Sequence, residues 1–280
     1  SYTSKGAFFW DLKDTDLYQI VDQHYTWGHN VEIKTTTNLK QSLPNLLHIP
    51  NNAGYGKNDL AIEASQITKE LLKISQAEII EKKVTKLLIK NNEVDGVQIG
   101  DEIHYADEVI LGTGLGTPDI LKSIGINFNM KSTLGLLAYS NKLPSILKYP
   151  ITGKDFHARQ DNNGRLIIGG QFDDDSSKES KIEEVAKKLI LDMASRLKYK
   201  GEIKLDYFTL GSRPLTNDGR PKIGRLKNSV GEIIKGVYIA VMHSGITNAP
   251  IVGKLGIEEI ISGKADILLH SFDPQPTNGS

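Results

Sequence analysis

The sequence predicts an α/β fold, because apolar runs typical of buried strands lead into small-residue turns and then into helical patterns. This order occurs at residues 108–122 and again at residues 236–263. Between them, residues 156–170 have the pattern of an antiparallel hairpin whose turn is Asp-Asn-Asn-Gly at 161–164. With 280 residues, 39% of them hydrophobic, the chain can bury a substantial core as one large domain or as two interleaved domains.

Composition narrows the possible partners. The 34 Lys and Arg residues balance the 34 Asp and Glu residues, so charge favours neither nucleic acid nor an anionic membrane, and a small-molecule substrate fits better. The absence of cysteine excludes disulfides, thiolate metal sites and cysteine nucleophiles. No apolar run reaches the roughly 18 to 20 residues that span a bilayer. We expect a cytoplasmic protein, and the sequence leaves its oligomeric state open.

The elements of the first half follow from periodicity and turn residues. Residues 65–73 have helical spacing, and residues 77–84 and 86–90 are predicted to be strands. A polar turn at 91–96 then leads into a further strand, which makes a hairpin or meander. The next apolar run, residues 108–111, is typical of a buried strand.

A glycine-rich loop follows that buried strand. Gly112-Thr113-Gly114 leads into Thr117 and Pro118, which are favoured at a helix start. Glycines let backbone N–H groups approach a phosphate, and a helix N-terminus favours an anion. A tight strand-to-helix turn explains the spacing equally well, because the glycines are not a full dinucleotide fingerprint and no acidic residue ends a second strand about 20 residues later.

The second half adds one helix, three strands and a closing helix. Apolar residues recur at helical spacing over 182–197, with charged residues on the opposite face. Strands are predicted at 205–210, 222–224 and 236–242, and a helix at 251–263 ending at a C-cap glycine. The last six residues, 275–280, have the composition of a disordered tail.

Arg213 is the most distinctive basic residue. It lies between Gly211 and Pro214 at the end of an apolar strand, where a rigidly held guanidinium can fork a carboxylate. An ordinary surface arginine is the alternative. The seven histidines form no HExxH or HxH pattern, and no G-x-S-x-G elbow is present, so neither a metal site nor serine hydrolysis is favoured.

The order of these segments resembles the D-amino-acid oxidase, glycine oxidase and sarcosine oxidase family of FAD enzymes. Residues 83–87 and 107–114 look like the family's adenine-contacting strand and its "ATG" loop, and 163–170 look like its "dG.lliGGt" strand. Residues 211–224 and 243–250 look like its "GlRP.tpDG.P.IG" and "GH.g.G..laP" elements, and this pair is the most specific.

The resemblance implies a FAD-binding, Rossmann-like domain, N-terminally incomplete, interleaved with an antiparallel-sheet substrate domain. We predict a flavin-proximal segment with part of the substrate domain at 1–64 and FAD-domain parts at 65–125 and 205–270. The rest of the substrate domain is predicted at 126–204, with a tail at 271–280. The positions matching the family's cofactor contacts are Thr3, Ser4, Val84, Gly112, Thr113, Gly114, Gly211, His243, Ser244, Gly245, Ile246 and Thr247.

The family also implies a reaction. The arginine matching Arg213 holds the substrate carboxylate, while the Cα hydrogen of an amine passes as hydride to the flavin N5 and the resulting imine is hydrolysed to an oxo acid. No side chain need act as a general base if the substrate binds as a free amine. His157 and Tyr139 are our candidates for the substrate pocket, with ordinary sheet residues as the alternative for each.

Three departures qualify the resemblance. The family's N-terminal G-x-G-x-x-G unit does not occur in these residues, and because Ser1 to Ser4 and Gly6 resemble the stretch just after it, we place the gap before Ser1. About one βαβ unit, roughly 30 to 50 residues, is expected there, and the 280-residue chain is expected to bind FAD poorly. Met242 and Ser212 replace the usual glycine and apolar residue. The alternatives are a 2-hydroxy-acid dehydrogenase on the same fold and a non-catalytic scaffold that has lost FAD.

Overall fold

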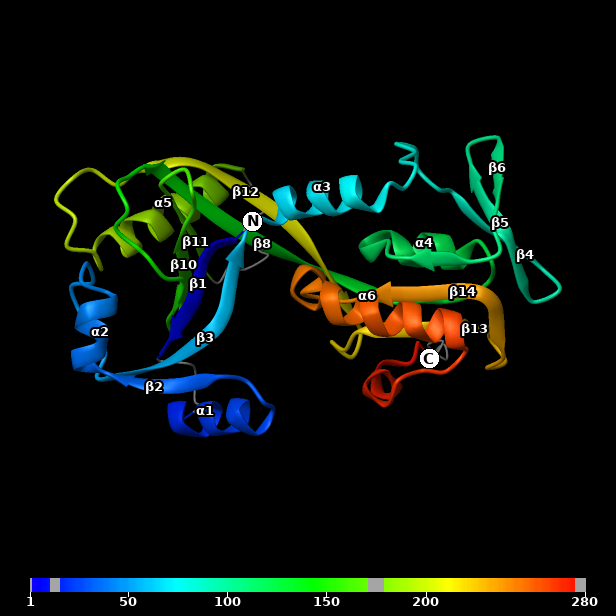
Figure 1. Ribbon diagram of the computed structural model, residues 1–280. Helices are drawn as coiled ribbons and strands as arrows, with labels where there is room; N and C mark the ends of the chain where they lie inside the picture. Colours follow the sequence, from blue (N-terminus) through cyan, green and yellow to red (C-terminus); the bar gives the residue numbers. More distant parts are fainter. Residues whose placement is uncertain (1, 11–15, 171–178, 275–280) are drawn as a thin grey trace. The chain divides into compact units, whose positions relative to one another are not determined.

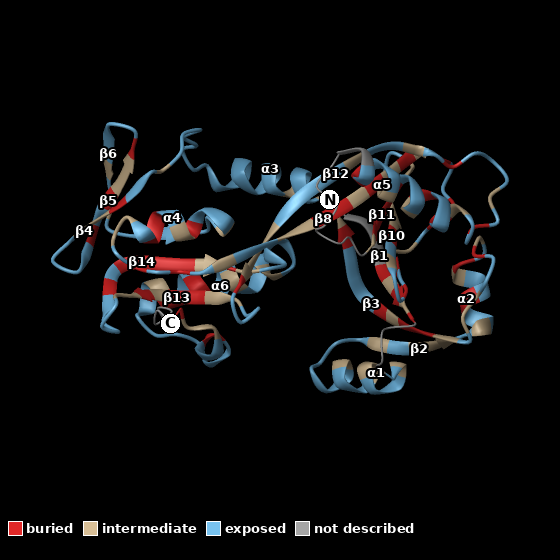
Figure 2. Cartoon of the chain, turned by 180° about the vertical axis from the view of Figure 1, so that it is seen from behind, coloured by how far each residue is buried: buried red, intermediate tan, exposed pale blue. Residues whose placement is uncertain are grey.

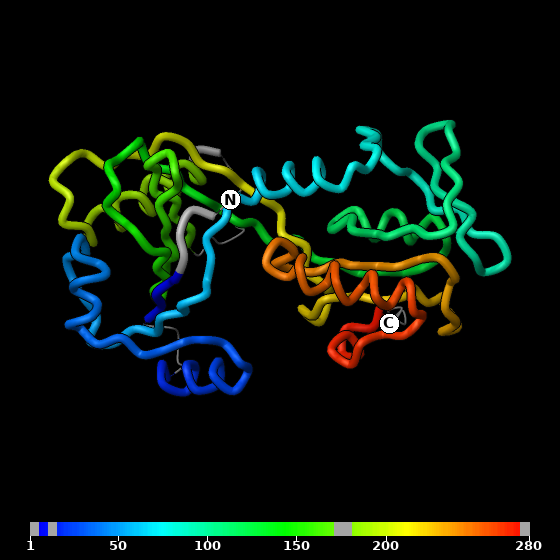
Figure 3. The backbone as a smooth tube through the Cα atoms, viewed as in Figure 1, coloured from blue at the N-terminus to red at the C-terminus, as the bar shows by residue number. Residues whose placement is uncertain are grey.

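The computed structural model describes residues 2–10, 16–170 and 179–274, with side chains from residue 6 onward in the first segment and from 181 in the last. The chain forms two compact units, each made of two separate stretches, as the colours in Figure 3 show. Unit 1 comprises Ser1–Ala77 and Leu134–Gly211, and unit 2 comprises Glu78–Thr133 and Ser212–Ser280. Each observed boundary lies later in the chain than the boundary we predicted from the sequence.

Unit 1 is built on an eight-stranded sheet with the order β12-β8-β11-β10-β9-β1-β3-β2. Its strands are β1 (Tyr2–Phe9), β2 (Val31–Thr35), β3 (Asn52–Ile62), β8 (Met130–Lys142), β9 (Ile151–Thr152), β10 (Phe156–Gln160), β11 (Arg165–Gly170) and β12 (Leu205–Thr216). The pairs β1–β3, β2–β3, β9–β10, β10–β11 and β8–β11 are antiparallel, whereas β1–β9 is parallel. The predicted antiparallel sheet is therefore present.

The hairpin of β10 and β11 shows how sequence sets this sheet. Gly164 takes a positive φ of 85°, and the Asp161 carboxylate accepts hydrogen bonds from the N–H groups of Asn163 and Arg165 at 2.9 and 2.8 Å. Such side-chain bonds fix a turn that L-residues otherwise resist. The predicted hairpin over 156–170 is confirmed.

The core of unit 1 lies on one face of the sheet. Helices α2 (Thr36–Ser42) and α5 (Glu179–Ala194) cover this face, and the apolar stripe of α5 contributes Ile182, Ala186, Ile190 and Met193. Figure 2 shows these segments in the colour of buried residues. Helices α1 (Leu17–Thr26) and α3 (Ala64–Ser75), by contrast, contain no buried residue. The predicted helix at 65–73 corresponds to α3, and the one at 182–197 to α5.

Unit 2 combines a parallel strand pair with an antiparallel meander. Its strands are β4 (Lys86–Lys90), β5 (Glu93–Ile99), β6 (Glu102–Tyr105), β7 (Val109–Leu111), β13 (Lys222–Lys227) and β14 (Ile233–Val241). β14 pairs with β13 in antiparallel fashion and with β7 and β5 in parallel fashion. β4, β5 and β6 form the predicted meander. The helical elements are η1 (Gly114–Gly116), α4 (Thr117–Lys122), α6 (Gly245–Ser262) and η2 (Ile267–Phe272).

β14 is buried on both faces, and its alternating side chains explain the layers. Val237 and Ile239 pack in the cluster that contains Leu121 of α4, whereas Tyr238 packs with Leu255 of α6. Successive strand residues point to opposite faces, so α4 and α6 cover opposite sides of the strand, an arrangement that can be followed in Figure 1. Unit 2 is thus a Rossmann-like α/β domain. No helix among the described residues combines the length and apolarity needed to cross a bilayer.

Three predicted boundaries were wrong. Residues 77–84 form no strand, and all but Val84 are exposed, so the pattern there has no core face to bury. Helix α6 begins at Gly245 rather than 251 and accommodates Pro250 in its second turn. The predicted tail from 271 is helical as far as Phe272, where η2 ends, and residues 275–280 lie outside the described part of the chain.

Candidate functional site

Two small-residue loops leave the same edge of the sheet in unit 2. β7 and β14 are parallel, with Leu111 opposite Ile239, so the carboxyl ends of both strands lie at one edge. Gly112 follows β7, and His243 follows β14 after one intervening residue. In α/β sheets ligands bind in the crevice outside such carboxyl ends. The topology therefore brings together two of the predicted cofactor-binding segments.

The backbone of each loop is held in a defined conformation. Gly114 has a φ of 51°, and Thr113 and Thr117 are joined by a hydrogen bond of 2.8 Å between their Oγ1 atoms. Ser244, the N-cap of α6, takes a φ of 58°, and its Oγ lies 2.6 Å from Nδ1 of His243. A positive φ is uncommon for a non-glycine residue and costs about 1–3 kcal/mol, so the neighbouring structure must hold it.

The same edge is open to an approaching ligand. A Cβ added to Gly112 or Gly245 would have no heavy atom of the described structure, apart from chain neighbours, within 4 Å. The first turn of α6 carries no acidic side chain, and its leading N–H groups have no intrahelical acceptor. Exposed N–H groups and the positive end of a helix dipole favour an anion. These residues fit a phosphate-bearing cofactor.

Pro214, the residue after Arg213 in β12, lies near the glycine loop. Its Cγ is 3.8 Å from the position that a Cβ would take on Gly114. The Arg213 side chain is half-buried, and within the described part of the chain it makes no hydrogen bond or ion pair. A partly desolvated guanidinium without a counter-charge is well suited to a carboxylate.

The turn after Arg213 is rigid. Asp218 accepts hydrogen bonds from Lys222 Nζ at 2.7 Å, from Thr216 Oγ1 at 3.0 Å and from the N–H of Arg220 at 3.1 Å. These contacts, the one with Lys222 above all, lower the pKa of Asp218 to about 2. The carboxylate thereby closes the Asn-Asp-Gly turn and fixes the end of β12 that carries Arg213.

Unit 1 presents aromatic rings on the sheet face opposite its core. Tyr139 stacks on Tyr207 with the ring centroids 4.3 Å apart and the planes inclined by 12°. The guanidinium of Arg165 lies 5.7 Å from the centre of the Tyr207 ring and forks Asp206 through Nε and Nη2 at 3.0 and 2.7 Å. Partial burial raises the pKa of the Tyr207 hydroxyl. The sequence did not reveal Tyr207, although its place directly before the core-packed Phe208 in a strand was a weak signal.

His157 occupies the same face as Tyr139. Tyr139 is opposite Ile167, and His157 is opposite Gly169, so both side chains project from one side of the sheet with β11 between them. Two strand spacings across the sheet and two residues along it separate them by about 12 Å. The imidazole covers Gly169 so closely that an added Cβ would lie 2.1 Å from its Nε2. This close approach explains why glycine stands at that position.

Known proteins agree with this arrangement of segments. The family model described as FAD dependent oxidoreductase (DAO) matches residues 6–258. The chain belongs to the FAD-dependent oxidoreductase family. The uncharacterized oxidoreductase YurR of Bacillus subtilis is 25% identical over 200 residues, which cover 67% of this chain and 51% of YurR. This chain therefore spans about half of that relative's length.

Solved structures of this family share the fold. Glycine oxidase from Bacillus cereus superposes with a TM-score of 0.75 at 22% identity, covering 99% of this chain and 78% of its own. L-proline dehydrogenase from P. horikoshii superposes with a TM-score of 0.80 at 19% identity, covering 98% and 76%. The predicted α/β fold, with a Rossmann-like domain and an antiparallel-sheet domain interleaved in the chain, is thus confirmed.

Three predicted cofactor contacts belong to other segments than the two glycine loops and stay predictions. Thr3 and Ser4 lie on β1, where Ser4 is opposite Ala61 of β3 in the sheet of unit 1. Val84 is in unit 2 and precedes β4. The structure thus gives Thr3 and Ser4 a role in sheet pairing that the short "TS…G" resemblance did not predict.

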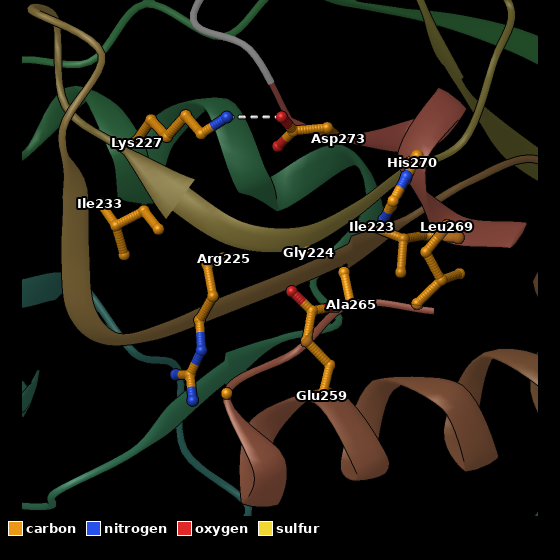
Figure 4. A pocket seen from close by; sticks show the side chains of 11 residues that line it. Ile223, Gly224, Arg225, Lys227, Ile233, Glu259, Ala265, Leu269, His270 and Asp273 are labelled. Atoms are coloured by element: carbon orange, nitrogen blue, oxygen red, sulfur yellow. Dashed lines mark hydrogen bonds and ion pairs between the residues drawn. The ribbon is translucent and has the colours of Figure 1, made fainter. Parts of the chain in front are cut away.

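A separate cavity of about 350 Å³ lies between β13, the end of α6 and η2 (Figure 4). Its cations already have carboxylate partners: Lys227 pairs with Asp273, and Arg225 donates from Nη2 to Glu108 at 2.9 Å. None of the predicted site residues lines it. The contrast with the unpaired guanidinium at Arg213 favours the glycine-loop edge as the functional site.

Proposed function

We propose that this oxidoreductase chain oxidises a small amino acid or a secondary amine that carries a carboxylate. The observation that carries the proposal is the half-buried Arg213 guanidinium, which has no counter-charge among the described residues. Pro214, the next residue, lies near Gly114 and restricts the backbone conformation of Arg213. A fixed guanidinium binds a carboxylate through two parallel hydrogen bonds and so sets the substrate's orientation.

The FAD-binding residues in this proposal are those of the two loops at the end of β7 and β14. Gly112, Thr113 and Gly114 offer an open backbone, and the segment from His243 to Thr247 offers the first N–H groups of α6. When bound, the flavin supplies the redox chemistry by accepting a hydride equivalent from the substrate. Gly211 of unit 1, where an added Cβ would meet no heavy atom within 4 Å, is proposed as a further cofactor contact.

The protein's own contribution is then binding and orientation. Arg213 holds the carboxylate, so that the Cα–H bond points in one direction, and no side chain is required as a general base for a substrate bound as the free amine. Tyr139 and His157 are proposed as substrate contacts, because their rings project from one face of the unit 1 sheet, opposite its core. The stacked partner of Tyr139, Tyr207, belongs to the same proposal.

Two relatives give the substrate class its range. One is a glycine oxidase and the other an L-proline dehydrogenase, so a primary and a secondary amine are each represented on this fold. A 2-hydroxy acid presents the same carboxylate to Arg213 and is the second candidate. The cytoplasmic location stays a prediction of the sequence.

The test is anaerobic reduction of the flavin. The protein is incubated with FAD and then given four groups of compounds: amino acids, secondary amino acids, 2-hydroxy acids and amines without a carboxylate. We expect loss of flavin absorbance with one or more amino or imino acids and with none of the carboxylate-free amines. Reduction by hydroxy acids alone establishes the second candidate. Because these 280 residues are expected to bind FAD poorly, the full-length protein decides the last outcome: if it takes up no FAD at all, both candidates are contradicted and a scaffold is supported.

A further inference from the structure

Helix α1 ends in a tight cap that brings two histidines together. Gly28 has a φ of 80°, its N–H donates to the carbonyl of Tyr25 at 2.9 Å, and the N–H of His29 donates to the carbonyl of His24 at 2.9 Å. These two bonds define a Schellman motif. In that motif the residue after the glycine normally makes an apolar contact with the helical residue five positions earlier.

Here that contact is made by two imidazoles. Nδ1 of His24 lies 3.1 Å from Nδ1 of His29. His24 is half-buried and His29 is exposed, so the pair is accessible from solvent. Each neutral imidazole has one protonated and one unprotonated nitrogen, and two facing Nδ1 atoms share one proton between them. The cap therefore places two imidazole nitrogens where most Schellman motifs have a contact between apolar side chains.

The surroundings restrain both rings. The Phe9 ring centroid is 6.2 Å from that of His24, and the Trp27 ring lies 5.5 Å from His24 and 6.4 Å from His29. The carboxylate of Asp59 interacts electrostatically with both imidazoles. Partial burial raises the pKa of Asp59, and the two histidines lower it. A nearby negative charge favours a cation at the pair.

We propose that His24 and His29 form a two-nitrogen site for a divalent transition-metal ion. Two ligands at about 2.0–2.1 Å from one ion have nitrogens roughly 3 Å apart, close to the observed separation. Imidazole suits copper, nickel and zinc, and Cu²⁺ binds most tightly of these. On binding, the shared proton moves to the outer Nε2 of its own ring, which leaves both Nδ1 lone pairs for the metal.

The site is a chelate completed by solvent. No third histidine, aspartate or glutamate among the described residues joins the pair in a ligand set, so water fills the remaining positions and Asp59 acts as a neighbouring charge. The HExxH and HxH patterns do not include this pair, because His24 and His29 are five residues apart. Two side chains at this spacing come together only when a residue with positive φ reverses the chain between them. Gly28 provides that reversal.

Calorimetric titration of the untagged chain with Cu²⁺ tests the proposal. We expect one tight site in the parent, and a loss of affinity of at least about tenfold in His24→Gln and in His29→Gln. His48→Gln, which removes an exposed histidine elsewhere in unit 1, is the matched control and should bind as the parent does. Electron paramagnetic resonance of the copper complex should show nitrogen coupling that is lost in His24→Gln. Equal affinity in the parent and in the His24→Gln variant overturns the site.

A second variant separates the cap from the ligands. Gly28→Ala keeps both imidazoles but strains the left-handed cap, and its added Cβ meets no other atom. We expect it to bind Cu²⁺ several-fold more weakly, with the loss of affinity matched by a fall in thermal stability. If Gly28→Ala binds Cu²⁺ as tightly as the parent, the cap does not present the pair and the proposal fails.

Discussion

The two units of this chain carry their candidate chemistry in different parts of the polypeptide. Unit 2 offers mainly backbone: open glycines after β7, the first turn of α6, and a single guanidinium beside them. Unit 1 offers side chains, with the stacked Tyr139 and Tyr207 and the imidazole of His157 on one sheet face. Backbone sites depend on φ and on the absence of Cβ atoms, whereas sheet-face sites depend on strand register.

This difference gives the two units different sensitivities. Substitution of Gly112 in unit 2 should change cofactor binding with little effect on packing, because the added Cβ projects into open space. Substitution of Gly169 in unit 1 should disturb the neighbouring side chain of His157. Arg213 differs from both, since it is the one proposed ligand-binding charge, and its loss should have the largest effect.

Arg213→Leu should reduce kcat/KM for carboxylate substrates by roughly two orders of magnitude, about 3 kcal/mol, because a partly buried charge pair loses one partner. Amines without a carboxylate should be affected far less. Steady-state kinetics with a matched amino acid and its decarboxylated amine measure the difference. The control is Arg220→Leu, which removes an exposed arginine from the turn that follows β12.

Equal losses for both substrates would remove Arg213 from the carboxylate site. The same conclusion would follow if Arg220→Leu were as damaging as Arg213→Leu. In either case unit 2 would keep only its proposed backbone site and would have no charged ligand-binding residue. The side-chain site proposed in unit 1 would be unaffected.

Much of unit 2 could be predicted because its determinants are local in sequence. A strand, a glycine loop and a helix start are consecutive at 108–122, and the parallel pairing of β7 and β14 then places the two loops at one edge. The isolated position of Arg213 between glycine and proline was readable for the same reason. The proximity of Pro214 to Gly114, in contrast, joins residues 100 positions apart, and the periodicity of the sequence does not predict it.

Unit 1 was harder because its geometry is set by register. The stacking of Tyr139 on Tyr207 depends on which residues of β8 and β12 meet, and a shift of one residue would turn a ring to the other face. The strand pairing of Thr3 and Ser4 could not be predicted for a similar reason, since a few residues of motif could not reveal that β1 pairs with β3. The prediction of a strand at 77–84 was wrong because no sheet pairs with this segment, so its apolar residues have no core to pack against.

Gly112→Ala should weaken FAD binding by about tenfold, roughly 1.4 kcal/mol, if the backbone there approaches a phosphate. Its stability should be unchanged or slightly higher, because a compatible glycine-to-alanine change reduces the entropy of the unfolded chain. Gly100→Ala, at a φ of 61° in the β5–β6 turn, is the reciprocal control. It should lower stability by about 1 kcal/mol and leave FAD binding intact. Flavin fluorescence titrations and urea unfolding give the two readouts, and a Gly112→Ala variant with parental affinity would contradict the phosphate contact.

Gly169→Ala should destabilise unit 1 by about 1 kcal/mol, because the new Cβ forces the His157 imidazole to move. Adding His157→Ala should remove the clash, so that Gly169→Ala becomes neutral or stabilising in that background. Urea unfolding of the parent, both single variants and the double variant completes the cycle. Strictly additive free energies of unfolding would show that the imidazole does not lie over Gly169.

The smallest effect is expected from the turn that fixes Arg213. Hydrogen bonds, chiefly from Lys222, lower the pKa of Asp218 from an ordinary 3.8 to about 2, so the folded state favours the carboxylate more than the unfolded state does. Its contribution to stability is therefore fully present above pH 3.8 and is lost as the pH falls through the folded value of about 2. Because Asp218 is half-exposed, solvent screening limits the effect to less than about 1 kcal/mol. In thermal unfolding scans, Asp218→Asn should lower Tm slightly at neutral pH and lose less stability than the parent between pH 3.8 and 2. A variant that tracks the parent through that window would show that the carboxylate does not hold the turn, and the rigidity of the strand end at Arg213 would then need another source.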